Sequence, residues 1–244
     1  MTPFLIVVVV FSAALVQTLS GFGFALLVMP IVTILIGLRA AAPLVALVGL
    51  TLYIINFIRY RRAISFRELL RLGVACALGV PVGIWALIHV DESIIKPVMG
   101  LILIAYAVYT LLRPTAPRLD SQWWVYPAGF AAGCLGGAYN TPGPPVVVYG
   151  SLRQWPKEEF RAVLQALFFV SAVLVVASHG LAHHLTAEVL TFYLYAVPAL
   201  LLGVAAGSRI DPKLNWDRFR TLITVMIMVL GLSLVLGLGA DVTR

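Results

Sequence analysis

Long runs of apolar residues restrict the fold of this chain more than any other feature. Six such runs lie at 40–58, 69–90, 97–112, 162–178, 188–207 and 221–238. Crossing the hydrocarbon core of a bilayer as a helix takes about 20 residues of this kind. Two further stretches, 3–37 and 122–152, are apolar but interrupted by Gly, Pro and small polar residues. The pattern predicts an all-α integral membrane protein with 1–244 as a single polytopic domain, and no soluble domain.

The charge content agrees with a membrane location. Only 11% of the residues are charged, whereas a soluble domain carries roughly 25%. The net charge of +7 would suggest a nucleic-acid partner in a soluble protein. Here the basic residues flank apolar runs, so the positive-inside rule of membrane proteins explains them better. We expect a lipid bilayer and no nucleic acid as partners, and a multi-pass location in the bacterial inner membrane.

The chain matches itself at an offset of 120 residues without gaps. Gly23 pairs with Gly143, Gly83 with Gly203 and Asp91 with Asp211, all in one register. The repeats span 1–115 and 121–240, and each contains one interrupted segment followed by three ordinary apolar runs. Internal repeats of this kind are typical of transporters. We therefore expect eight helical segments in two related halves.

The basic residues indicate how the halves are oriented. If every segment crosses once, the inside loops hold 8 of the 17 Lys and Arg residues, which is no bias. If 3–37 and 122–152 are re-entrant hairpins, 14 lie inside and 3 outside, namely Arg39, Lys96 and Arg244. The positive-inside rule favours the hairpin model, in which the second half is inverted relative to the first. The orientation of the first hairpin depends on symmetry alone.

The two interrupted segments carry the most unusual residues. The first contains Gln17-Thr18-Leu19-Ser20-Gly21-Phe22-Gly23, and the second runs from Gly133 to Pro145 through Gly136-Gly137-Ala138-Tyr139-Asn140-Thr141-Pro142-Gly143. Pro breaks a helical ladder and Gly permits turns. Non-helical backbone at membrane depth is tolerated only when protein buries it or it lines a watery cavity. We expect both interruptions to face each other near the membrane midplane.

Such breaks predict a binding site for a small anion. A helix that begins inside the membrane presents unpaired N–H groups and the positive end of its dipole. We expect helix starts near Gly23 and Pro145. The candidate substrate-binding side chains with hydroxyl or amide donors are Gln17, Ser20, Tyr139, Asn140 and Thr141. The alternative, that the glycines only permit close helix packing, applies above all to Gly129 and Gly133.

Several of these motifs resemble those of the sulfite exporter TauE/SafE family. They are Ser20-Gly21-Phe22-Gly23 with Pro30, and the run 129–149 followed by Leu152-Arg153-Gln154-Trp155, Phe160-Arg161-Ala162 and Gln165. The resemblance extends over essentially the whole chain. It implies a secondary transporter, most simply an exporter, of sulfite, a sulfonate or another small anion, working by alternating access. Its motifs include Arg161 and Gln165, which we add to the candidate binding residues. For Arg161 the alternative is a plain positive-inside anchor at the start of its apolar run. The Asn-Thr-Pro-Gly-Pro-Pro run departs from the simpler Gly-rich run of many members, which leaves the substrate open.

Cysteine, histidine and asparagine residues within or beside the apolar runs allow other functions. Cys76 and Cys134 lack a Cys-x-x-Cys spacing, so an intramembrane thiol-redox protein is only an alternative, as is another membrane-embedded enzyme. His179, His183 and His184 lie where we expect a solvated outer loop, not a metal site. Asn56 either faces the cavity or marks the interface. We predict no catalytic residues, metal or cofactor, and leave homo-oligomerisation open.

The acidic residues all fall at the ends of apolar runs or in loops. Proton-coupled carriers often use a carboxylate buried in the membrane. We therefore expect no proton coupling through an acid, and propose that an anion leaves the cell down the inside-negative potential.

Overall fold

The structure, a computed structural model, describes residues 2–61, 65–112 and 119–210, with short pieces between 224 and 236. All the secondary structure of these ranges is helical. The elements are α1 (Thr2–Ser20), α2 (Phe24–Ile36), α3 (Leu38–Tyr60), α4 (Phe66–His89), α5 (Glu92–Leu112), a 3-10 turn η2 (Gln122–Trp124), α6 (Val125–Tyr139), α7 (Gly143–Leu152), α8 (Lys157–Leu181) and α9 (Ala187–Ile210). The predicted all-α membrane class is thus confirmed.

Within the ranges that the structure describes, five helices are long and apolar enough to cross a membrane. They are α1, α3, α4, α8 and α9. The predicted runs 40–58, 69–90, 162–178 and 188–207 correspond to four of them, whereas the fifth, α1, forms the first half of the interrupted segment 3–37. The predicted run 97–112 lies within α5. Most of the run 221–238 lies outside the described residues.

Two short breaks divide the interrupted segments where the sequence predicts them. Residues 21–23 separate α1 from α2, and residues 140–142 separate α6 from α7. Gly21 and Gly23 have φ of 82° and 106°, a left-handed conformation that glycine adopts without a steric cost. Asn140 has φ of 56° and ends α6 as its C-cap. The breaks are therefore encoded locally, by residues suited to leaving the right-handed helix.

Most of the basic residues in the described ranges lie at one end of the molecule, which we call the basic end. The ends of α3 and α9 meet there through a 2.9 Å hydrogen bond from Arg59 Nη1 to Ser208 Oγ. The end of α7 meets the start of α4 there through Arg153 and Glu68, whose Nη2 and Oε1 are 3.8 Å apart. The basic residues of these helix ends are Arg59, Arg61, Arg67, Arg71, Arg153, Lys157, Arg161 and Arg209.

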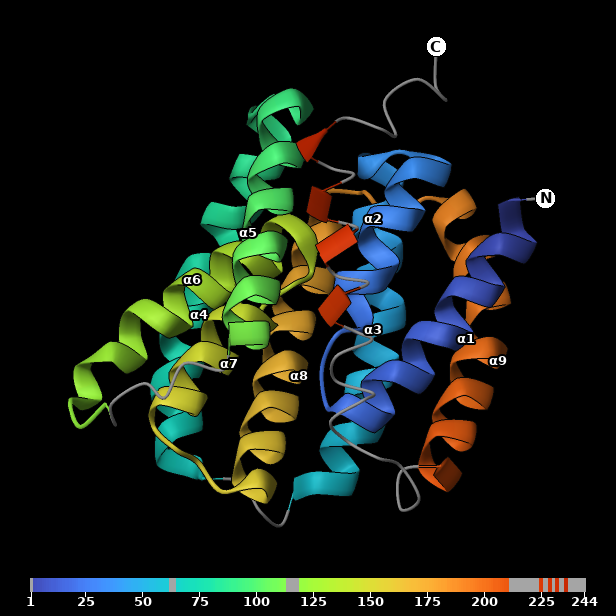
Figure 1. The fold of residues 1–244 in the computed structure, drawn as a ribbon. Coiled ribbons are helices and arrows are strands. Elements are labelled where there is room, and N and C mark those ends of the chain that lie inside the picture. The colour runs from blue at the N-terminus through green and yellow to red at the C-terminus, as the bar shows by residue number, and fades with distance from the viewer. Residues whose placement is uncertain are drawn as a thin grey trace.

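The helices run between the basic end and an opposite end, defined by the start of α3 and the ends of α4 and α8. In Figure 1, α1 descends from the opposite end and α2 returns to it, whereas η2 and α6 start from the basic end and α7 returns there. Helices α3 and α9 run toward the basic end, and α4 and α8 run away from it.

The first and last helices pack together, and so do two helices of the middle. The most extensive contacts between helices join α4 to α6 and α1 to α9. Both are close approaches of backbone at glycine: Gly83 lies against the carbonyl of Cys134, and an added Cβ at Gly203 would lie 2.5 Å from the carbonyl oxygen of Phe11. Gly129 and Gly133 likewise abut α4, so close packing explains both of them.

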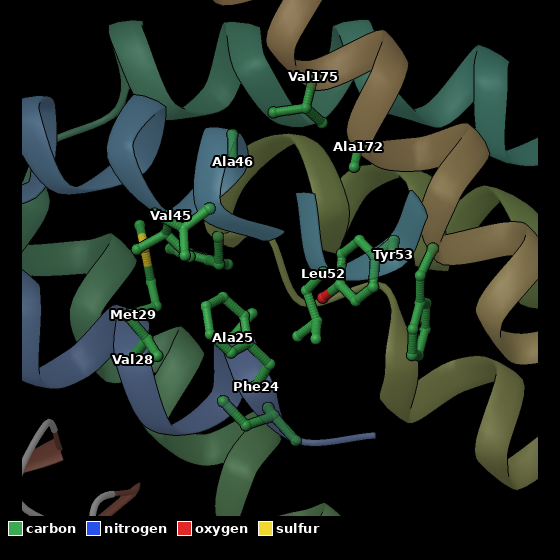
Figure 2. Packing of buried hydrophobic residues seen from close by; sticks show 14 of the residues in the cluster. Phe24, Ala25, Val28, Met29, Val45, Ala46, Leu52, Tyr53, Ala172 and Val175 are labelled. Carbon is green, nitrogen blue, oxygen red and sulfur yellow. The ribbon is translucent and has the colours of Figure 1, made fainter. Parts of the chain in front are cut away.

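The core lies around α3 and α8 in the middle of the bundle. Figure 2 shows Phe24, Val28 and Met29 of α2 packed against side chains of α3, with Ala172 and Val175 of α8 on another side. Helices α3 and α8 each have most of their membrane-length segment buried inside the protein, 61% in both cases, whereas α1, α4 and α9 have 33–39%. The central pair therefore supports the two broken segments from the inside.

Candidate functional site

The first break is held by side chains from three helices. Gln17 of α1 receives a 2.9 Å hydrogen bond on its Oε1 from the backbone N–H of Phe24, the first residue of α2. Its Nε2 lies 3.4 Å from the Gly21 carbonyl oxygen and 3.4 Å from Gln165 Oε1. Gln17 thus connects both sides of the break and reaches across to α8.

Three carboxamides from α1, α3 and α8 meet beside this break. The Nε2 of Gln165 donates to the Gly21 carbonyl, and Asn56 Nδ2 donates to Gln165 Oε1 over 3.2 Å. Gln17, Asn56 and Gln165 are each 1–2% exposed. Burying a polar group costs free energy unless it is hydrogen-bonded, so this cluster is fixed by its mutual bonds. We call Gln17, Asn56 and Gln165 the amide cluster.

Arg161 brings a positive charge to the same break. Its Nη2 donates a 3.0 Å hydrogen bond to the carbonyl oxygen of Leu19, in the last turn of α1. Its aliphatic stem lies beside Gly21, where an added Cβ would be 3.3 Å from Arg161 Cγ. A cation at a helix C-terminus is favourable for the helix dipole. The guanidinium therefore stabilises the end of α1 and also places a charge one helical turn from Gln165.

Ser20, Phe22 and Gly23 complete the first break. The Ser20 oxygen lies within hydrogen-bonding distance of the carbonyl oxygens of Val16 and Phe22, which compete for its single hydrogen, and it accepts from the Phe22 N–H. It is therefore occupied with the backbone of its own loop in this structure. Of the donors predicted here, the N–H of Phe24 is likewise satisfied by Gln17.

The second break lies against α3 and the middle of α8. Asn140 Nδ2 donates a 2.8 Å hydrogen bond to the carbonyl oxygen of Ala42, in the second turn of α3. The backbone N–H groups of Asn140 and Thr141 bond to the carbonyls of Gly136 and Leu135, which closes the end of α6. Gly143 lies beside Phe168, and Gly136 beside the Ser171 hydroxyl and Pro142.

The start of α7 agrees with the predicted helix start near Pro145, since it lies two residues before that proline. It begins at Gly143, so Pro144 and Pro145 are its second and third residues. Proline carries no N–H. This first turn therefore offers an anion fewer donors than an ordinary helix start, and the prolines serve to set the backbone after the break.

The remaining residues of the second segment have distinct surroundings. Gly137 lies against the carbonyl of Val80 on α4, so it belongs to the close contact between α4 and α6. Tyr139 and Thr141 are buried. The predicted site residues thus gather in two groups. Gln17, Ser20, Gly21, Phe22, Gly23, Arg161 and Gln165 lie at the first break, and Gly136, Tyr139, Asn140, Thr141, Pro142 and Gly143 at the second.

A pair of aromatic rings lies next to residues of both breaks. Tyr53 of α3 and Phe168 of α8 have ring centroids 5.3 Å apart. Gly49 is adjacent to Tyr53 and to Phe24, and Gly143 is adjacent to Phe168. Along α8, the first break contacts residues 161–165 and the second contacts 168–171, so they lie at neighbouring levels about 10 Å apart at 1.5 Å per residue.

Two polar residues turn out to have a definite place. Asn56, for which the sequence left two roles open, belongs to the amide cluster and not to the interface. The only sequence signal for this role was a single Asn inside an apolar run.

The expectation of a solvated histidine loop is wrong for His179. This residue lies in the last turn of α8 and is 1% exposed, and its Nδ1 is 3.1 Å from that of His184.

The cysteines are both unpaired thiols, on α4 and α6. Cys76 is buried and Cys134 half-buried. Both belong to the glycine-rich contact between these helices, where Gly133 abuts the Cys76 carbonyl. Within the described parts of the chain, no group of three or more His, Cys, Asp and Glu residues is arranged to hold a metal ion.

Comparison with known proteins places the chain among transporters. A probable sulfite/organosulfonate exporter TauE of Cupriavidus necator is 23% identical over 228 residues, covering 90% of this chain and 88% of that protein. A probable inner membrane transporter protein TsaS of Comamonas testosteroni is 24% identical over 175 residues, or 71% of this chain and 73% of that protein. No solved structure matches the chain.

The family profile described as sulfite exporter TauE/SafE matches residues 6–234, which includes both breaks, the amide cluster and Arg161. This match and the two relatives identify a multi-pass membrane transporter rather than an enzyme. The resemblance seen in the motifs is thereby confirmed, and the chain belongs to the sulfite exporter TauE/SafE family.

Proposed function

We propose that this protein exports a small organosulfur oxyanion, sulfite or a sulfonate, across the bacterial inner membrane. The observation that carries the proposal is the group of donors at the first break, where Arg161 and the amide cluster converge on the end of α1. The names of the two relatives, an exporter of sulfite or organosulfonate and an inner membrane transporter, agree with this substrate and location.

The chemistry of the cluster suits an oxyanion. A guanidinium presents two parallel N–H donors that match two oxygens of an oxyanion, and carboxamide N–H groups supply neutral donors around it. In this structure those donors bond to the carbonyls of Leu19 and Gly21 and to one another. We propose that they turn to the substrate when it enters, and that the carbonyl bonds hold them in place between turnovers.

We further propose that the chain works by alternating access between two inverted halves, 1–115 and 121–240. Helix bounds that agree at an offset of 120 support the repeat, since Leu38–Tyr60 corresponds to Lys157–Leu181, and Phe66–His89 to Ala187–Ile210. The corresponding helices run in opposite directions between the basic end and the opposite end, which supports the inversion.

Reciprocal packing supports the same relation. Gly83 of α4 meets Cys134 of α6, while Gly203 of α9 meets Ala14 of α1, where an added Cβ would lie 3.0 Å from the Ala14 Cβ. Gly203 lies 120 residues after Gly83, and Cys134 lies 120 residues after Ala14. Each broken segment thus packs on an unbroken helix of the other half, and rocking of the halves would change the access to both breaks.

Counterflow of labelled sulfite into proteoliposomes preloaded with unlabelled sulfite tests the proposal. Arg161→Gln removes the charge, and Gln165→Glu keeps the shape but places a carboxylate next to the anion. Loss of a hydrogen bond to a charged group costs about 1.5–3 kcal/mol, so we expect an apparent affinity at least about tenfold weaker for Arg161→Gln. Gln165→Glu should abolish counterflow.

The matched control is Arg67→Gln. Arg67 is an exposed arginine in the first turn of α4, also at the basic end, so the variant changes net charge equally without touching the cluster. It should retain wild-type counterflow. Wild-type activity in Arg161→Gln and Gln165→Glu, or equal loss in all three variants, would contradict the proposed site.

A further inference from the structure

A pocket at the opposite end of the molecule lies apart from both breaks. It has a volume of about 400 Å³ and is lined by the start of α3 and the end of α4, through Leu38, Arg39, Leu87, Ile88, His89, Val90 and Asp91. Its size is within the range of small-molecule sites, which are typically about 300–1,000 Å³. None of its lining residues belongs to the predicted binding set or to the amide cluster.

Arg39 gives this pocket its main recognition group. The side chain is exposed, and among the described residues it makes no hydrogen bond or ion pair, even though Asp91 lines the same pocket. It stands in the first turn of α3, directly after Gly37, whose φ of 76° turns the chain from α2 into α3. A guanidinium that is not engaged by the described residues favours an anion.

The other polar groups of the pocket are held by their own neighbours. His89 Nδ1 is 3.0 Å from the carbonyl oxygen of Trp85. Because a carbonyl oxygen only accepts, Nδ1 carries the hydrogen there, and the imidazole ring stacks on Trp85. Asp91 directly precedes α5, so its negative charge faces the positive end of that helix dipole.

From this arrangement we propose that the pocket is a second anion site, which binds a small oxyanion through Arg39. The planar guanidinium pairs with two oxygens at once, so the site should prefer an oxyanion such as a sulfonate to chloride. The oxyanion is either a free solute or the phosphate of a lipid headgroup, since Trp85 and Ile88 beside the pocket are exposed apolar side chains. The proposal is independent of the transport site at the first break.

Protection of a cysteine from alkylation tests the site without measuring transport. Ile88→Cys places a reporter in the pocket lining, in a full-length chain whose own cysteines are replaced by Cys76→Ser and Cys134→Ser. The reagent is N-ethylmaleimide, which is neutral, so the charge of Arg39 does not itself steer it. Methanesulfonate should slow labelling in maltoside detergent, and chloride at equal ionic strength should not. Val90→Cys is a second reporter if Ile88→Cys does not fold.

Arg39→Gln is the decisive variant. We expect the half-protecting concentration of methanesulfonate to rise about tenfold or more, the loss expected for one charge-assisted hydrogen bond. Leu181→Cys, an exposed position at the end of α8 outside the pocket, should label at the same rate with or without the anion. Arg161→Gln should leave the protection intact, which separates this site from the transport site.

The source of the oxyanion follows from repeating the assay in phosphatidylcholine liposomes. Protection by methanesulfonate in both detergent and liposomes indicates a site for free anions. Protection in detergent alone, with slow labelling in liposomes that Arg39→Gln restores, indicates a lipid phosphate in the pocket. Both results support the oxyanion site. No protection in detergent, equal protection by chloride, or protection unchanged in Arg39→Gln would overturn it.

Discussion

At the scale of single residues, glycine has two separate uses in this protein. Gly21, with φ of 82°, gives the backbone a conformation that other residues rarely adopt. Gly83 and Gly203 have helical backbone, and their role is to leave room for the carbonyls of Cys134 and Phe11 on the facing helix. Without a hydrophobic driving force between helices in lipid, such close packing is a main source of association.

Alanine at Gly83 or Gly203 should destabilise the protein. An added methyl group would overlap the facing backbone, which cannot move aside as a flexible side chain can. Overpacking typically costs about 1–3 kcal/mol. We expect Gly83→Ala and Gly203→Ala each to lower the unfolding midpoint of the detergent-purified protein, measured by thermal unfolding.

Gly73→Ala is the matched control, because Gly73 lies in the same helix α4 and an added Cβ would meet no atom within 4 Å. Alanine is the better helix former, so this variant should be neutral or more stable by up to about 1 kcal/mol. Equal stability of Gly83→Ala and Gly73→Ala would show that α4 and α6 do not approach closely at Gly83.

At the scale of elements, the breaks are set by local residues but fixed in space by distant ones. The left-handed Asn140 ends α6, and its side chain bonds to Ala42, 98 residues earlier in the chain. Gln17 spans the first break and reaches Gln165, 148 residues later. The sequence predicted both interruptions from Gly and Pro. It did not predict the partners, because hydrogen bonds between distant segments have no local signature.

Substitution of Asn140 separates backbone strain from the side-chain bond. Asn140→Gly keeps the left-handed backbone and loses only the hydrogen bond to Ala42, which should lower the free energy of unfolding by about 1 kcal/mol. Asn140→Ala also places a non-glycine residue without a polar side chain in the left-handed conformation, which should lower the free energy of unfolding by about 1–2 kcal/mol more. We expect unfolding free energies in the order wild type, Asn140→Gly, Asn140→Ala. If both variants were equally stable, residue 140 would not be left-handed in the folded protein.

At the scale of the whole molecule, the acidic residues of the described ranges are confined to helix starts and connections. In the described ranges every Asp and Glu stands in a connection or in the first turn of a helix: Glu68, Asp91, Glu92, Asp120, Glu158, Glu159 and Glu188. Asp211, Asp217 and Asp241 lie outside those residues. The described helices therefore offer no carboxylate at mid-membrane for a proton relay, and the notion of potential-driven export stays a prediction.

Membrane potential should therefore set the distribution of the substrate. An inside-negative potential of 100 mV contributes about 2.3 kcal/mol to the exit of one negative charge, or about a fifty-fold gradient. We expect potassium diffusion potentials in proteoliposomes to shift the final sulfonate gradient by this factor, whichever way the protein is inserted. A gradient that ignores the potential would indicate electroneutral coupling.

The order of the helices and the position of the breaks are properties of the sequence by itself, because apolar length, Gly and Pro act locally. The motifs in the sequence likewise predicted the family to which the chain belongs. Only the tertiary structure decided that Asn56 is hydrogen-bonded within a cluster with Gln17 and Gln165, and that Gly137 permits close packing of α6 on α4. It also decided that His179 is buried and that Arg39 lines a pocket. Each of these depends on which helix faces which, and that follows from the packing of segments far apart in the chain.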